Sequence, residues 1–125
     1  MKQMVITILT SFLMAPAVAH ATDDISGIWL TQKQDSRIEI SRNPDGSYTG
    51  KIIWAQAPHQ NYVGTLVMKD VKYDPQNKFY TCPWIYDPRL DVTAHGHMTI
   101  SGDTLNVKAS KGFLSKDEIF TRVAK

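Results

Sequence analysis

Apolar and polar residues alternate along much of the chain, and this period of two residues predicts β-strands. The clearest example is residues 92–100, and residues 104–110 repeat the pattern. In the first of these segments one face carries Val92, Ala94, Gly96, Met98 and Ile100, and the other carries Thr93, His95, His97 and Thr99. One apolar face per strand indicates an antiparallel sheet that is solvated on its other face.

Eight such segments are separated by turn signals such as Asn-Pro-Asp-Gly and Ser-Gly-Asp. They span residues 27–31, 37–41, 48–54, 65–72, 79–86, 92–100, 104–110 and 118–123. No stretch of ten residues has a clear helical period, although residues 115–118 could form a short turn of helix. We expect an all-β domain that closes into a single small antiparallel up-and-down barrel of about eight strands, with room for at most a modest cavity.

Strict alternation also assigns side chains to faces in the third and fifth segments. The apolar face of the third carries Tyr48, Gly50, Ile52 and Trp54, and one face of the fifth carries Tyr80, Cys82, Trp84 and Tyr86. Pro83 has no N–H to donate, so it must lie at an edge, at a bulge or at a position that donates no ladder hydrogen bond.

Two short pieces indicate how the predicted barrel closes. Gly27-Ile28-Trp29 opens the first strand, and Phe120-Thr121-Arg122 lies in the last. In a closed barrel the Trp29 indole can plug the floor while the Arg122 guanidinium stacks across it and donates to backbone carbonyls. We therefore interpret Gly27, Trp29 and Arg122 as structural residues of barrel closure rather than as ligand contacts.

Residues 1–21 are predicted to form a secretory signal peptide. Met1-Lys2 supplies a basic start, residues 4–14 are mostly apolar, and Ala19-His20-Ala21 fits a small-X-small cleavage site. The apolar run is shorter than the roughly 20 residues of a membrane span. We therefore expect an exported protein with one domain, residues 22–125, and no membrane span after cleavage.

The charge balance argues against a nucleic-acid partner. Without Lys2, the 14 basic residues become 13 against 12 acidic ones, so the mature net charge is about +1. The two signs are interspersed, with no basic stripe for nucleic acid and no polybasic patch for a membrane surface. The single cysteine, Cys82, cannot form a disulfide within the chain. It is either a buried inert thiol, which we favour, or a reactive or intermolecularly paired one.

Several motifs together resemble one family. They are Gly27-Ile28-Trp29, Arg37-Ile38-Glu39-Ile40, the segment 45–54, Ile85-Tyr86-Asp87-Pro88, Gly112-Phe113-Leu114 and Phe120-Thr121-Arg122. They resemble the exported bacterial calycin-like proteins known as domain of unknown function 2147, from about Gly27 to Val123. The resemblance implies a lipocalin-like barrel in the bacterial periplasm or outside the cell, and it supplies no catalytic residues. The chain departs from the family pattern after Pro88, where residues 89–92 replace a Gly-Lys and an aromatic residue, and at Phe120, where the family often has tryptophan.

No combination of residues demands catalysis or a metal. The chain has no Gly-X-Ser-X-Gly motif and no carboxylate pair at a readable spacing. A Cys82 thiol with His95 or His97 as its base would need strands in a register that the sequence does not define. His95 and His97 lie roughly 7 Å apart on one strand face, but this is the face opposite the apolar one, so surface histidines without a metal are favoured. We predict no catalytic residues, no metal and no cofactor, and we do not expect an enzyme.

Aromatic side chains remain as candidates for a binding site. Trp54, Trp84 and Tyr86 are the predicted ligand contacts, because amphipathic rings can line a pocket or its mouth; filling the core is the alternative for each. Arg89 either meets an anionic head group at the rim or is a solvated turn charge. The function favoured is binding of a small apolar or amphipathic ligand. The alternative is a structural or interaction protein of the cell envelope, with a filled barrel that contacts a protein partner through the loops at residues 55–63 and 87–91.

Overall fold

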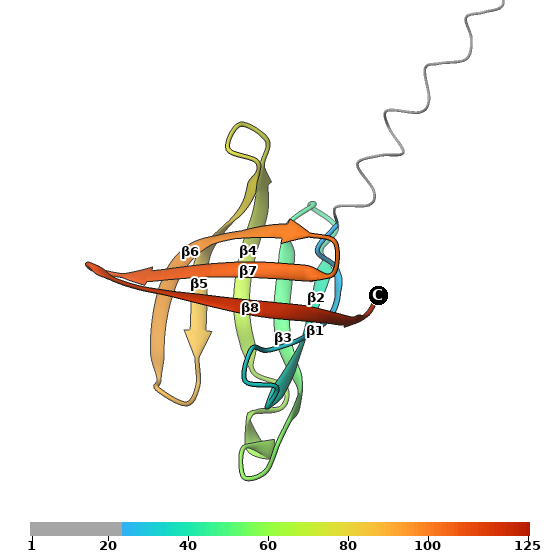
Figure 1. The fold of residues 1–125 in the computed structure, drawn as a ribbon, viewed down its shortest axis with the longest axis vertical. Helices are drawn as coiled ribbons and strands as arrows, with labels where there is room; N and C mark the ends of the chain where they lie inside the picture. The colour runs from blue at the N-terminus through green and yellow to red at the C-terminus, as the bar shows by residue number, and fades with distance from the viewer. Residues whose placement is uncertain (1–23) are drawn as a thin grey trace, which may run out of the picture.

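The computed structural model describes residues 24–125, and the predicted signal peptide at residues 1–21 lies outside them. Eight antiparallel strands form one closed barrel, in which each strand pairs with the next and β8 pairs with β1 (Figure 1). The strands are β1 (Gly27–Leu30), β2 (Ser36–Arg42), β3 (Tyr48–Ala55), β4 (Leu66–Asp74), β5 (Phe79–Asp87), β6 (Val92–Ser101), β7 (Thr104–Lys111) and β8 (Leu114–Ala124). The prediction of a small all-β, up-and-down antiparallel barrel of about eight strands is confirmed.

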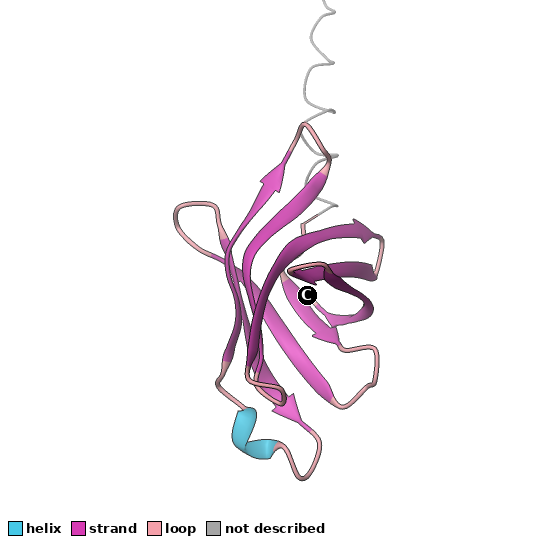
Figure 2. Cartoon of the chain, turned by 90° about the vertical axis from the view of Figure 1, so that its left-hand side faces the viewer, coloured by secondary structure: helices cyan, strands magenta, loops and turns pink. Residues whose placement is uncertain are grey.

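The up-and-down order places alternate connections at opposite ends of the barrel. The β1–β2, β3–β4, β5–β6 and β7–β8 connections share one end, which we call the open end, and the β2–β3, β4–β5 and β6–β7 connections share the other, the closed end. A single turn of 3-10 helix, η3 (Gln60–Tyr62), lies in the β3–β4 connection, beyond the ends of the strands in Figure 2. The described residues thus contain very little helix, as the alternation predicted.

The last strand is longer than predicted. β8 begins at Leu114 rather than at residue 118, and the possible turn of helix over residues 115–118 is wrong. Backbone pairing with β7 runs without a break from the hairpin tip, for example through Lys108↔Asp117. The neighbouring strand supplies the ladder hydrogen bonds for these polar residues, whose own sequence carries no strand signal.

A β-bulge in β3 places Trp54 on the outer face of the barrel, so the predicted inward face is wrong for this residue. β2 pairs Ile38 with Ile52 but the adjacent Arg37 with Trp54, so β3 contains one extra residue. An extra residue reverses the alternation, because successive side chains point to opposite faces. Ile52 and Ala55 are buried, whereas Trp54 is 39% exposed, with the Arg37 guanidinium 5.2 Å from its ring centroid.

A second bulge reverses the alternation in β5. Along β6 the pairing moves from Gly96 to Ala94, while along β5 it moves from Cys82 to Ile85. The predicted shared face held Tyr80, Cys82, Trp84 and Tyr86. Beyond the bulge that assignment is wrong, because Ile85 takes the inward position. Pro83 lies within the bulge, one of the three positions predicted for it, where its missing N–H costs no ladder hydrogen bond.

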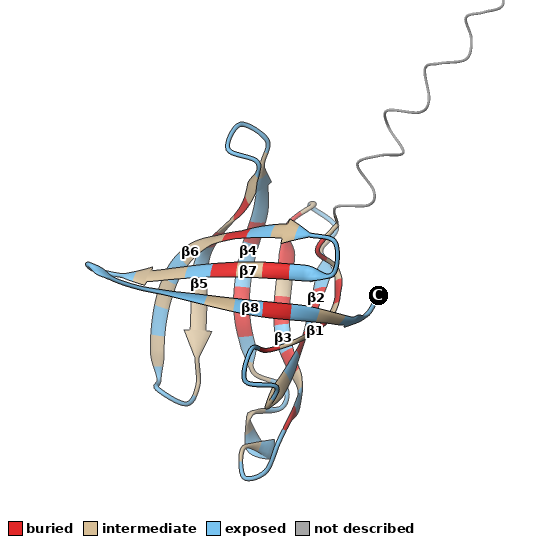
Figure 3. Ribbon diagram, viewed as in Figure 1, coloured by how far each residue is buried: buried red, intermediate tan, exposed pale blue. Residues whose placement is uncertain are grey.

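The core fills the closed half of the barrel. Figure 3 shows buried residues in the middle of β7 and β8 and along the strands behind them. The largest fully buried side chains are Trp29, Ile25, Ile40, Met68, Met98, Leu105, Val71 and Cys82. Tyr48 and Tyr80 are also buried, with their rings edge-to-face at 5.7 Å. The closed half therefore has its interior filled.

Candidate ligand-binding cavity

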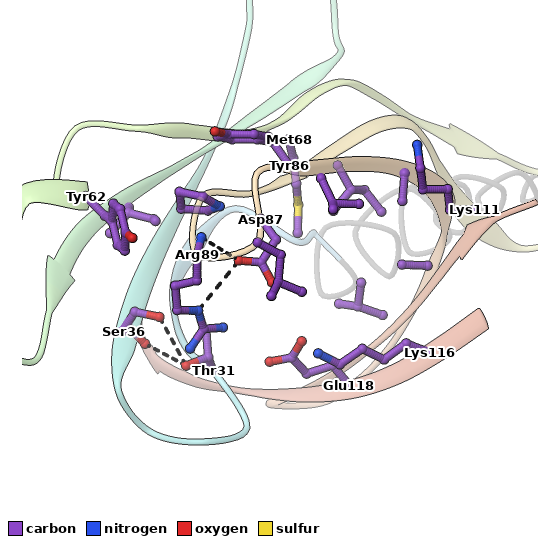
Figure 4. A pocket seen from close by; sticks show the side chains of 18 of the residues that line it. Thr31, Ser36, Tyr62, Met68, Tyr86, Asp87, Arg89, Lys111, Lys116 and Glu118 are labelled. Carbon is purple, nitrogen blue, oxygen red and sulfur yellow. Dashed lines mark hydrogen bonds and ion pairs between the residues drawn. The ribbon is translucent and has the colours of Figure 1, made fainter. Parts of the chain in front are cut away.

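A cavity of about 450 Å³ occupies the open half of the barrel (Figure 4). Buried side chains form its floor: Ile52, Met68, Val107 and Phe120. Ile85, Val92, Ala94 and Ala109 continue the apolar lining along the walls. These residues come from six of the eight strands, and each lies on the inward side of its strand. The volume falls within the range of roughly 300–1,000 Å³ that is usual for small-molecule sites.

An ion pair crosses part of the mouth. The Arg89 Nη1 donates to Asp35 Oδ2 at 2.9 Å, which joins the β5–β6 hairpin to the β1–β2 connection. The Arg89 Nε also lies 3.6 Å from Asp87 Oδ1 (Figure 4). The guanidinium is therefore matched by two carboxylates. The sequence did not predict this pairing, and contact of Arg89 with an anionic head group stays a prediction.

Glu118 brings a carboxylate to the cavity wall. It lies two residues before Phe120 on β8 and pairs in register with the inward-facing Val107, so its side chain is on the inner face. Figure 4 shows this side chain among the residues that line the cavity, with no hydrogen bond or ion pair drawn to it. The alternation did not single out Glu118, because the predicted strand began at this residue and gave it no apolar neighbour before it.

The three predicted ligand contacts do not lie together in the cavity. Tyr86 lines the mouth, where its hydroxyl donates to Asp91 Oδ1 at 2.9 Å. Trp84 stacks on Tyr86 with ring centroids 5.7 Å apart and carries the Lys69 ammonium 4.4 Å from its ring, and it is not among the described residues that line the cavity. Trp54 is likewise outside that lining. A ligand contact for any of the three stays a prediction.

Gly27, Trp29 and Arg122 lie together at the closed end. The Arg122 guanidinium carbon is 4.4 Å from the Trp29 ring centroid, and the indole Nε1 donates to the Ile25 carbonyl at 2.9 Å. Arg122 also donates to the carbonyls of Ser26 and Asp24, at 2.7 and 3.1 Å. Gly27 has φ +139°, and a Cβ there would lie 2.9 Å from the Arg122 Nη1 and 2.7 Å from a β8 carbonyl oxygen. A side chain at residue 27 would therefore displace the guanidinium.

Replacing Arg122 by alanine is expected to lower the free energy of unfolding by roughly 2–3 kcal/mol, because two backbone carbonyls lose their charged donor. Urea denaturation of the mature protein measures the change. Arg89→Ala is the matched control, since it removes an arginine whose ion pairs are at the surface, and should cost less than about 1 kcal/mol. Equal losses in the two variants would contradict the closing role of Arg122.

The cysteine and the histidines of β5 and β6 do not form a reactive pair. Cys82 is buried, and burial raises the pKa of its thiol to about 12, so the thiol is protonated near neutral pH. Its cross-strand neighbour is Gly96, and the residues on either side of that glycine, His95 and His97, point to the opposite face. His97 instead stacks on Phe79, with ring centroids 4.3 Å apart.

Two further properties concern only residues 24–125. Within this range no helix is both long and apolar enough to cross a membrane. Within the same range no three or more histidine, cysteine, aspartate or glutamate side chains are grouped so that they could hold a metal ion.

The fold and the cavity define a class: a small closed eight-stranded barrel, filled at one end and hollow at the other, consistent with a calycin-like description. Residues 27–122 match the model of a bacterial family described as "Uncharacterized protein conserved in bacteria (DUF2147)". The chain belongs to this family. The matched range includes Trp29 and Arg122. Comparison with curated proteins and with solved structures gave no match.

Proposed function

We propose that this protein is an exported carrier, in the periplasm or outside the bacterial cell, of one small apolar or amphipathic ligand. The observation that carries the proposal is the cavity of about 450 Å³ with a buried apolar floor. Apolar surface that lines a solvent-accessible cavity is stabilised when an apolar ligand displaces water from it.

The contrast between the two halves of the barrel supports the same proposal. At the closed end the interior is filled by three large aromatic side chains, those of Trp29, Tyr48 and Tyr80. The barrel is therefore wide enough to hold side chains of this size. At the open end the inward positions Ala94 and Ala109 hold side chains of a single methyl group. Small residues at these positions leave a space that larger ones would occupy.

Filling that space should abolish binding. Ala94→Phe is expected to remove ligand that co-purifies with the protein from its own cell envelope, because the added ring would occupy the cavity. Native mass spectrometry measures bound mass and oligomeric state together. Thr93→Phe is the matched control: the neighbouring position on β6 is exposed and points outward, so bound mass should be unchanged. A wild-type barrel that neither retains a small molecule nor takes one up in solution would overturn the proposal.

A second candidate function is contact with a protein of the cell envelope through the open end. The β7–β8 hairpin carries Phe113, which is 98% exposed, and Leu114, which is 69% exposed, and the β5–β6 hairpin carries Leu90, which is 67% exposed. Exposed apolar side chains on neighbouring loops are typical of interaction surfaces. The same mass spectra test this function. A partner protein that stays bound to the Ala94→Phe variant but is lost from a Phe113→Ser variant would favour partner binding over the carrier function.

A further inference from the structure

Glu118 is a charged side chain of the cavity wall that has no partner among residues 24–125. Its carboxylate lines the cavity wall, half-buried, and makes no hydrogen bond or ion pair with the rest of residues 24–125. A buried polar group in a folded protein normally has a partner, in the protein or in ordered solvent. Solvent in the open cavity can hydrate this carboxylate only while the cavity holds water.

Two other cations at the mouth, Arg89 and Lys111, are already matched. Arg89 contacts the carboxylates of Asp35 and Asp87, as described above, and the Lys111 ammonium donates to the Thr93 carbonyl at 3.2 Å. Lys116 is the remaining cation on the inner face of β8. It is exposed, and strand geometry places it roughly 7 Å farther from the floor than Glu118. No ion pair within 4 Å joins its ammonium to the Glu118 carboxylate, and both side chains lie on the same wall of the cavity (Figure 4).

A ligand that fills the cavity also removes water from Glu118. The apolar floor at Met68, Val107 and Phe120 favours a hydrocarbon tail, and a tail seated there brings the remainder of the ligand up to the level of Glu118. A purely apolar or an anionic ligand would leave a desolvated carboxylate with no donor, which is strongly unfavourable. A ligand with an ammonium group at that level would instead supply the missing donor and the opposite charge.

We propose that the cavity selects cationic amphiphiles, an alkyl chain that carries an amine, and that Glu118 is the residue that recognises the amine. This inference rests on the proposed carrier function and assigns the ligand class that the function leaves open. Glu118 acts as the acceptor of the ammonium hydrogen bond, and the apolar floor gives affinity without regard to the head group.

Three probes of equal chain length test the assignment: octylamine, octanol and octanoate, each titrated calorimetrically into the mature protein at pH 7. Octylamine should bind about tenfold more tightly than octanol, the lower end of what a charge-assisted hydrogen bond contributes at a half-exposed site. Octanoate should bind more weakly than octanol, because its carboxylate meets that of Glu118. This ratio of affinities is measured on the wild-type protein and needs no variant.

Glu118→Gln keeps the size and hydrogen-bonding capacity of the side chain and removes its charge. It should bring the octylamine and octanol affinities to within about twofold of each other. Asp117→Asn is the matched control: it makes the same change of net charge at the neighbouring position on β8, where the carboxylate points outward to Lys108 at 2.8 Å. The preference for octylamine should persist in this control.

The outcomes separate the two proposals. If none of the three probes binds, or if binding survives Ala94→Phe, the carrier function fails and the ligand class fails with it. If octanol binds in the cavity but octylamine gains nothing, or if octanoate binds best through Lys116, the amine assignment is overturned and the carrier function stands.

Discussion

Replacing Trp29 by alanine is expected to lower the free energy of unfolding by about 4 kcal/mol, the range measured for truncation of large buried aromatic residues. The side chain is fully buried, its Nε1 donates to the Ile25 carbonyl at 2.9 Å, and the Arg122 guanidinium covers its ring. Truncation leaves a void at the closed end, an unsatisfied carbonyl and a guanidinium without its aromatic partner. Urea denaturation and the midpoint of thermal unfolding measure the loss.

Trp54→Ala is the matched control for this prediction, because it removes the same side chain from the outer face. Trp54 is 39% exposed and contacts the Arg37 guanidinium at 5.2 Å, so its loss should cost about 1 kcal/mol. The double variant Trp29→Ala/Arg122→Ala should lower the free energy of unfolding by less than the sum of the two single changes, because Trp29 and Arg122 contact each other. Equal losses at Trp29 and Trp54 would show that the closed end contributes no more than the surface.

The fold was predictable because its determinants are local. A period of two residues marks each strand, and residues of the Ser-Gly-Asp kind mark the short connection between β6 and β7. Ser101 pairs with Thr104 as a tight hairpin requires, which brings the apolar faces of both strands into one core. Consecutive antiparallel hairpins then leave only the pairing of the first and last strands to be inferred, and Gly27-Ile28-Trp29 and Arg122 indicated that pairing.

The outward positions of Trp54 and Trp84 were not predictable by counting in twos. A bulge adds one residue to one strand of a pair, so its presence depends on the partner's register rather than on the strand's own sequence. Pro83 was the one local signal, since proline is confined to edges, strand starts and bulges. β3 contains no equivalent signal near Ile53, which lies between the buried Ile52 and the exposed Trp54.

The chemistry of the cavity mouth was also beyond local patterns. The ion pair of Asp35 and Arg89 joins residues 54 positions apart, and both belong to connections whose meeting depends on closure of the barrel. The inward position of Glu118 could be inferred only from the full length of β8. Once β8 begins at Leu114, residues 116, 118, 120 and 122 share one face, so the Glu118 carboxylate lies on the same face as the buried Phe120. The sequence did not predict where β8 begins, because the polar residues before Ile119 show no alternation of apolar and polar positions.

Replacing Gly96 by alanine is expected to destabilise the barrel by more than about 3 kcal/mol, at the upper end of the cost of overpacking. A Cβ at this position would overlap the Lys108 carbonyl oxygen and would lie 2.8 Å from the carbonyl carbon and 3.0 Å from the Ala109 Cα. All three atoms belong to the β7 backbone, so no side-chain rotation relieves the overlap and the two strands must separate. Soluble yield and the midpoint of urea denaturation measure the effect.

Gly50→Ala is the matched control, since it adds the same methyl group at another glycine within a strand. There the nearest atoms belong to the Met68 side chain, at 3.2–3.4 Å. The Met68 Cγ and Sδ can rotate away, and the 3.2 Å contact with the Met68 Cβ needs a shift of only a few tenths of an ångström, so this variant should lose about 1 kcal/mol. The difference in stability between the two variants therefore tests whether the β7 backbone lies in direct contact with Gly96 on β6. A Gly96→Ala protein as stable as Gly50→Ala would show that the strands stand farther apart, and that the wall of the cavity formed by Ala94 and Ala109 is wider than the structure has it.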